Sequence, residues 1–227
     1  MSRPPTEQEV ALRALCLTAV AAAGAYATVL LVEPDAADEV FEATADLTDW
    51  LHEDGLAVGL SSRERALLEH PLEEWSEEQR LAAASCGESL GVLLWTLSIV
   101  DALPPWDEPF DAVELAPLGD SLEELLERSQ LRDKDEIERA RDLAELWQWR
   151  ATAAGRDFDV LGGTARAAFD AGDIGEPIDG DFPVFDKAYR DLDPDETALA
   201  ASIAVERRHA LAWLCGQTAD WDLVAGE

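Results

Sequence analysis

Apolar residues recur every three to four positions along most of the chain, which is the spacing that places them on one face of a helix. Pro34, Pro71 and Pro104 interrupt this pattern, because proline cannot continue a helix. The predicted helices cover 7–31, 35–53, 61–70, 76–100, 121–129, 133–154 and 193–215. No stretch alternates apolar and polar residues convincingly enough to predict a strand. The predicted fold class is therefore all-α, a compact bundle of about seven helices.

Capping signals predict where several of these helices begin. A Ser or Thr followed three residues later by Glu can exchange hydrogen bonds with the backbone of the first turn. Three such pairs stand where a predicted helix begins: Thr6 with Glu9, Ser61 with Glu64, and Ser121 with Glu124. The last helix has Asp193 as its expected cap and Pro194 in the first helical position, where proline is well tolerated.

The segment 155–193 differs in composition from the rest of the chain. It is rich in Gly, Pro and Asp, which are typical of turns and loops. We expect a loop-rich excursion with one short helix near 164–169, inside a single helical domain that spans 1–227. A surface excursion, a mobile flap and a hairpin are all compatible with this composition.

The charge of the chain limits its partners. Forty-nine acidic residues against seventeen basic ones give a net charge of −32. Nucleic acids and anionic membrane surfaces both attract positively charged proteins, so we expect neither partner. The acidic residues are spread along the chain. This distribution favours an acidic surface that is solvated all over, as in a protein of a salt-rich cytoplasm. It is less typical of a protein that imitates nucleic acid in order to bind a basic partner.

An uncharged run from Ala14 to Val32 is long enough to cross a membrane. Its many Ala residues and Gly24 make it only modestly hydrophobic, and Glu7 and Glu9 precede it where a signal peptide carries positive charge. We interpret the run as a buried helix of a soluble protein. The three cysteines lie far apart in apolar stretches, which predicts reduced thiols and a cytoplasmic protein.

Five blocks, in order along the chain, resemble one family. They are 50–56 (WLHEDGL), 60–66 (LSSRERA), 93–97 (LLWTL), 100–105 (VDALPP) and 206–214 (ERRHALAWL). On these blocks the chain resembles the bacterial domain-of-unknown-function family numbered 4272, over most of residues 8–216. The segment 155–193 is longer than is usual in that family. The resemblance implies a shared fold and no mechanism, because the family has no established activity.

The last predicted helix carries a pair of residues that could have chemical roles. Glu206 and His209 are three positions apart, so they share one face of the helix. A di-iron centre in a helical bundle needs two Glu-x-x-His pairs and two further carboxylates, and the chain has no second pair. We therefore predict no metal site. No nucleotide-binding, zinc-protease or nucleophile-elbow motif is present either, so we predict no cofactor.

Arginines near tryptophans indicate a different kind of site. In a chain with so few cations, they could form a pocket for an anion or a carboxylate. The candidate pocket residues are Trp147, Arg150, Glu206, Arg208, His209 and Trp213. In the alternative interpretation, the arginines pair with the abundant acidic side chains and cover the faces of the tryptophan rings.

Two functions remain open from the sequence. The missing catalytic motifs and the plain helical design favour a non-catalytic interaction or accessory protein, whose partner is another protein or a second copy of the chain. The alternative is a small-molecule binder or an enzyme whose pocket lies near Arg150, Glu206, Arg208, His209 and Trp213. The sequence does not decide whether the protein is an enzyme.

Overall fold

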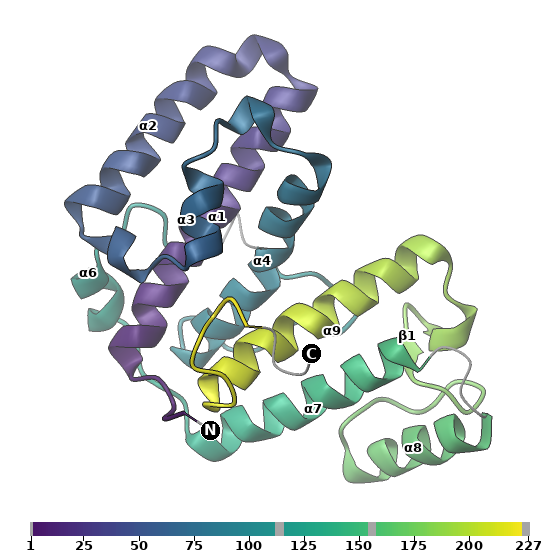
Figure 1. Ribbon diagram of the computed structural model, residues 1–227. Coiled ribbons are helices and arrows are strands. Elements are labelled where there is room, and N and C mark those ends of the chain that lie inside the picture. Colours follow the sequence, from purple (N-terminus) through teal and green to yellow (C-terminus); the bar gives the residue numbers. More distant parts are fainter. Residues whose placement is uncertain (1, 112–115, 154–157, 224–227) are drawn as a thin grey trace.

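The computed structural model describes residues 2–111, 116–153 and 158–223 (Figure 1). The described part of the chain contains eight α-helices and one two-stranded sheet, which confirms the predicted all-α class. The helices are α1 (Glu7–Val32), α2 (Ala37–Glu53), α3 (Ser62–Leu68), α4 (Glu77–Thr96), α6 (Leu122–Glu127), α7 (Lys134–Thr152), α8 (Phe158–Ala171) and α9 (Pro194–Leu214). The strands are β1 (Pro183–Val184) and β2 (Lys187–Ala188), and short 3₁₀ helices cover Pro34–Ala36, Leu56–Gly59, Leu72–Glu74 and Tyr189–Asp191.

The predicted capping boxes are present at the start of α1, α3 and α6. In each, the cap hydroxyl accepts a hydrogen bond from the backbone of the third helical residue, and the Glu side chain accepts one from the cap backbone. Helix α9 begins in the same way, with Asp193 capping the backbone N–H groups of Asp195 and Glu196. These bonds satisfy donors that have no partner inside the helix, which is why the starts were predictable.

The end of α4 differs from the prediction, which extended this helix to residue 100. The helix ends at Thr96, and Ser98 takes a left-handed conformation with φ of 57°. The carbonyl groups released there are bonded by a distant segment: the guanidinium of Arg132 donates to the carbonyls of Trp95 and Val100, at 2.6 and 3.0 Å. Long-range hydrogen bonding thus ends the helix while the side chains are still apolar.

Helix α4 lies at the centre of the main core, between α1 and α9 (Figure 1). Leu90, Leu93 and Leu94 are completely buried, as the all-round apolar pattern indicates. The packing is close enough that a Cβ atom added at Gly91 would lie 2.4 Å from the ring of Phe110. Glycine at this position therefore allows the loop carrying Phe110 to approach the helix.

A smaller core joins α7, α8, the β-hairpin and α9. Its buried residues are Trp147, Ala165, Phe182, Val184, Tyr189, Ala200 and Ala204. The two strands pair antiparallel, with Pro183 opposite Ala188 and Val184 opposite Lys187. The prediction of single-domain organisation over 1–227 stays a prediction.

The segment 155–193 is more ordered in secondary structure than predicted. The short helix expected near 164–169 is the fourteen-residue α8, and residues 154–157 lie outside the described part of the chain. Gly162 and Gly163 weakened the sequence signal, because each glycine costs a helix about 1 kcal/mol relative to alanine. Burial of Ala165 and Ala168 on one face of α8 offsets that cost.

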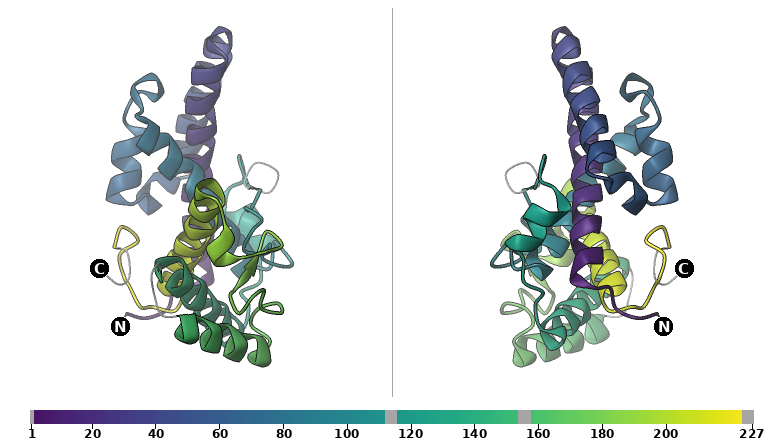
Figure 2. Two further views of the ribbon diagram at one scale, coloured as in Figure 1. Left: turned by 90° about the vertical axis from the view of Figure 1, so that its right-hand side faces the viewer. Right: turned by 90° about the vertical axis from the view of Figure 1, so that its left-hand side faces the viewer.

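Helix α1 is buried over its first half and continues, with α2, into a hairpin that projects from the rest of the molecule (Figure 2). By its length and composition alone, α1 could cross a membrane. Half of its most apolar 18-residue stretch, however, is buried inside the structure. The start of the described chain lies against the end of α9, since the backbone N–H of Ser2 donates to the carbonyl of Gly216 at 2.9 Å.

Candidate functional site

Arg150, one of the arginines in the predicted anion pocket, is fully engaged inside the protein. Its guanidinium donates to both carboxylate oxygens of Asp181 at 2.6 Å and lies 4.3 Å from the ring centre of Tyr189. Burial alone would raise the pKa of Asp181, but hydrogen bonds from Arg150 and from the backbone of Phe182 lower it. Arg150 thus pairs with an acid, as the alternative interpretation expects, but the ring that it covers is that of Tyr189 and not a tryptophan.

The neighbouring arginine of α9 is engaged in the same manner. Arg207 donates to Glu88 at 2.8 Å and to the carbonyl of Pro104 at 2.6 Å, and it lies 5.0 Å from the ring centre of Trp106. Both the arginine and the carboxylate are buried. A buried pair of this kind is fixed by its mutual attraction, so neither side chain is available to a ligand.

The six predicted pocket residues do not form one pocket. Trp147 and Arg150 belong to the smaller core, where Trp147 stacks on Trp106 at 5.4 Å. Glu206 and His209 face a separate cavity. Trp213 packs edge-on against Trp221, and Arg208 is half-buried on α9 with interactions of its own. Successive residues of α9 point in different directions, so 206 and 209 share a face that 207 does not.

The cavity that contains Glu206 and His209 lies between α1, α3, α4 and α9 and has a volume of about 230 Å³. The segment after α9 closes one side with Trp221 and Asp222. Apolar and small side chains form most of the wall: Leu17, Val20, Leu67, Ala82, Ala83 and Val205. The polar and ionisable residues around it are Arg63, Glu64, Cys86, Ser89, Glu206, His209 and Asp222. A cavity with apolar walls and a few converging polar groups is the usual form of a small-molecule site.

Glu206 is half-buried in the cavity wall and has no cationic partner among the described residues. The hydroxyl of Ser89 lies 2.9 Å from its carboxylate Oε2 and 3.0 Å from its backbone carbonyl. Burial raises the pKa of Glu206, the nearby charge of Glu88 raises it further, and the Ser89 hydrogen bond lowers it in part. The carboxylate therefore sits in an environment that disfavours its charge.

His209 lines the same cavity, one helical turn from Glu206. Burial lowers its pKa, and a hydrogen bond to the backbone of Trp221 opposes that shift. The imidazole packs edge-on against the ring of Trp221, with 4.7 Å between the ring centres. The ring atom Nδ1 is buried and has no hydrogen-bond partner in the described structure.

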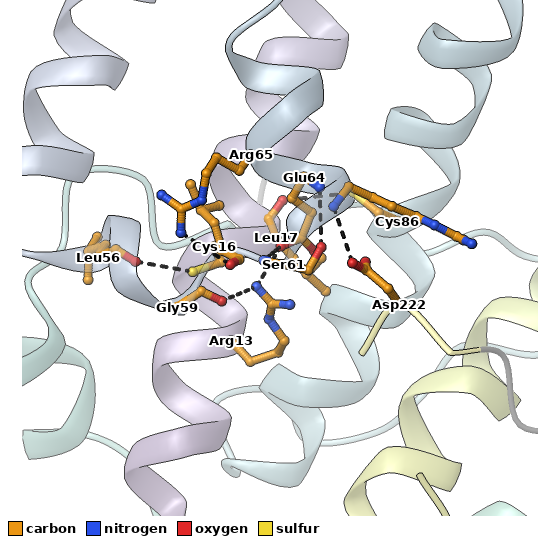
Figure 3. A network of polar contacts seen from close by, with 12 residues as sticks. Arg13, Cys16, Leu17, Leu56, Gly59, Ser61, Glu64, Arg65, Cys86 and Asp222 are labelled. Atoms are coloured by element: carbon orange, nitrogen blue, oxygen red, sulfur yellow. Dashed lines mark hydrogen bonds and ion pairs between the residues drawn. The ribbon is translucent and has the colours of Figure 1, made fainter. Parts of the chain in front are cut away.

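Arg13 and Glu64 form an ion pair beside the cavity (Figure 3). The arginine donates to Glu64 at 2.6 Å and to the carbonyl of Gly59 at 2.6 Å, and both charged side chains are buried. Glu64 also accepts the backbone N–H of Ser61 as part of the capping box. The guanidinium of Arg13 lies 5.0 Å from the ring centre of Trp221. Glu64 is thus neutralised, in contrast to Glu206.

The cysteines do not offer a reactive thiol. All three are free; Cys16 is buried, and Cys86 and Cys215 are half-buried. The thiol of Cys86 donates to the carbonyl of Ala83 at 2.9 Å, and burial raises its pKa. Thiolate chemistry requires the opposite shift. Among the described residues no group of three or more His, Cys, Asp or Glu could hold a metal ion.

Sequence reasoning found Glu206 and His209 by their helical spacing but missed the residues that complete the cavity. Ser89 lies 117 positions away from its partner Glu206, and Trp221 lies beyond the last helix. The backbone N–H of Arg63 donates to Asp222 at 3.2 Å across 159 positions. No local pattern connects these residues, so only the fold brings them together.

Comparison with known proteins supports the resemblance seen in the sequence. No curated protein and no solved structure matches the chain. A family profile matches residues 2–163, which is more than half of the 227 residues. The matched part includes Arg13, Glu64 and Ser89, whereas Glu206 and His209 follow it. The chain therefore belongs to the family described as Domain of unknown function (DUF4272).

Proposed function

We propose that the protein binds a small organic cation, such as a primary amine with a short apolar body, in the cavity that Glu206 and His209 line. One observation carries this proposal. The buried carboxylates Glu64, Glu88 and Asp181 each have an arginine within 2.6 to 2.8 Å. Within the described part of the chain, the carboxylate of Glu206 is bonded by the hydroxyl group of Ser89 and by no arginine.

An ammonium group would supply what Glu206 lacks. A carboxylate withdrawn from water loses hydration energy, and a charged partner restores much of it. Hydrogen bonds to charged groups contribute about 1.5–3 kcal/mol, against roughly 1 kcal/mol for neutral ones. An ammonium carries three N–H donors, so it can bond the Glu206 carboxylate and still use a donor on another acceptor of the cavity.

The walls and the charges of the cavity limit the rest of the ligand. A volume of about 230 Å³ and an apolar wall suit a short alkyl or aromatic chain. The sequence-based alternative of an anion or carboxylate ligand relied on arginines, and Arg150 is paired with Asp181 instead. Glu206 and Asp222 would repel an anion, and the cation on the cavity lining, Arg63, is exposed.

The proposal is tested by thermal unfolding with ligands that differ only in their charged group. Isopentylamine and 4-methylpentanoate share one alkyl chain and carry opposite charges. At a hundredfold excess over its dissociation constant a ligand stabilises by about 2.7 kcal/mol. For a chain of this size that raises the melting temperature by roughly 5–10 °C.

Variants identify the site. Glu206→Gln should remove most of the shift caused by the amine, and Glu73→Gln, at an exposed position far from the cavity lining, should leave it unchanged. A shift with the carboxylate and none with the amine would overturn the proposal. So would an equal amine shift in wild type and in Glu206→Gln.

A further inference from the structure

The second half of α1 and α2 form a hairpin that projects from the rest of the molecule (Figures 1 and 2). Leu31 and Val32, the last residues of α1, are 62% and 66% exposed, and Phe41 in the second turn of α2 is 48% exposed. Large apolar side chains grouped at a projecting point are typical of an interaction surface. We call these three residues the apolar tip.

The hairpin that carries the apolar tip is rich in acidic residues. Residues 14–62 contain nine acidic residues and no Lys or Arg, so all seventeen basic residues of the chain lie elsewhere. The nine are Glu33, Asp35, Asp38, Glu39, Glu42, Asp46, Asp49, Glu53 and Asp54. All nine are exposed, and none forms an ion pair within the described structure.

The charge selects the kind of partner. A second copy of this chain would bring another nine carboxylates to the same contact, and like charges at that density oppose association. Anionic lipid surfaces are repelled for the same reason. A positively charged segment gains from the field of the hairpin, and an apolar stripe on that segment would cover the exposed side chains.

We propose that the apolar tip and the surrounding carboxylates dock a basic amphipathic helix of another protein. Its apolar stripe covers Leu31, Val32 and Phe41, and its Lys and Arg side chains pair with carboxylates such as Asp35 and Asp38. Such a helix presents apolar residues at spacings of three and four with cations on either side. This inference is independent of ligand binding in the cavity.

The probe is a fluorescent amphipathic peptide of about 18 residues made of Leu and Lys, long enough to form a helix when bound. Two further peptides separate the contributions: a Ser/Lys peptide of the same charge without an apolar stripe, and a Leu/Glu peptide with the charge reversed. Binding to the full-length protein is measured by fluorescence anisotropy. The Leu/Lys peptide should bind at least about tenfold more tightly than either of the others.

Variants locate the contact. The combined substitutions Leu31→Ser, Val32→Ser and Phe41→Ser should weaken Leu/Lys binding about tenfold or more. Val58→Ser is the matched control, because Val58 is 82% exposed but follows the opposite end of α2. Phe41→Ser alone should give a smaller loss in the same direction. All these side chains are exposed, so circular dichroism melting should confirm that each variant folds.

Three results would overturn the inference. The first is equal binding of the Leu/Lys and Ser/Lys peptides, which would mean attraction by charge alone. The second is equal loss with Val58→Ser and with the triple variant. The third is a dimer in sedimentation experiments that the triple variant disrupts, which would assign the tip to a second copy of the chain.

Discussion

Glu206→Gln tests whether the carboxylate in the cavity really lacks a cationic partner. The substitution keeps the size of the side chain and its hydrogen bond with Ser89, which can still donate to the amide oxygen. A hydrogen bond to an ionised acceptor is stronger than one to a neutral acceptor by about 1 kcal/mol, so this much is lost. The gain is the removal of a charge from a site where burial penalises it; that penalty is several kcal/mol for a fully buried ion and about 1–2 kcal/mol for a half-buried one such as Glu206.

The two contributions together predict an unliganded variant that is as stable as wild type or more stable by about 1 kcal/mol at neutral pH. The gain should depend on pH. Because burial raises the pKa of Glu206 above its ordinary value of 4.5, the folded protein holds this proton at a pH where the unfolded chain has lost it. The contribution of Glu206 to stability therefore falls as pH rises through this range.

Urea unfolding followed by tryptophan fluorescence measures the difference directly. The free energy of unfolding should be compared for both proteins near neutral pH and near pH 3, which is more than one unit below the ordinary pKa of 4.5, so that the carboxyl group is protonated in both states and the gain should vanish. A variant less stable than wild type by about 2 kcal/mol or more would refute the reasoning. That cost is typical of breaking an ion pair and would mean that Glu206 has a cationic partner in solution.

Three further predictions concern other contacts. Asp181→Asn should cost about 3–5 kcal/mol in urea unfolding, because it leaves the buried charge of Arg150 without its counter-charge; a cost below about 1 kcal/mol would contradict this. The free energy of unfolding should fall as pH drops below about 6.5, because the pKa of His209 is lowered in the folded state and the unfolded chain therefore takes up the proton first. His209→Gln should reduce that pH dependence, and identical pH profiles of wild type and variant would contradict this prediction. Gly91→Ala should destabilise by about 1–3 kcal/mol in thermal unfolding, because the added carbon meets the ring of Phe110; an unchanged melting temperature would show that the ring moves freely.

Much of the fold was predictable because it is encoded locally. The capping boxes that begin at Thr6, Ser61 and Ser121 use residues three positions apart, and each starts a helix in the structure. The end of α4 was not predictable, because the cation that bonds its last carbonyls, Arg132, belongs to a segment more than thirty residues later. Local patterns say where a helix can form, and distant partners decide where it stops.

The candidate site shows the same division. The spacing of Glu206 and His209 on one helix was enough to place them on one face of α9 and toward one cavity. Assigning Arg150 to that group failed, because its partner Asp181 lies in a segment whose composition predicted mainly loop. In a chain with forty-nine acidic residues, no pattern in the sequence indicates which carboxylate will meet which arginine.

The contrast between paired and unpaired carboxylates also explains why the cavity differs from the rest of the interior. The pairs of Arg13 with Glu64 and of Arg207 with Glu88 hold helices together, since each joins two different elements. Glu206 joins α9 to α4 only through the neutral hydroxyl of Ser89. Within the described part of the chain, Glu206 therefore differs from these paired carboxylates in having no arginine beside it.

Calorimetric titration of isopentylamine into wild type and Glu206→Gln tests the central claim most directly. Near neutral pH the account predicts one binding site per chain in wild type and about tenfold or weaker binding in the variant, the loss expected for one charge-assisted hydrogen bond. It also predicts no measurable heat of binding with 4-methylpentanoate. Equal affinity of wild type and variant for the amine, or tighter binding of the carboxylate, would contradict the claim that Glu206 recognises a cation.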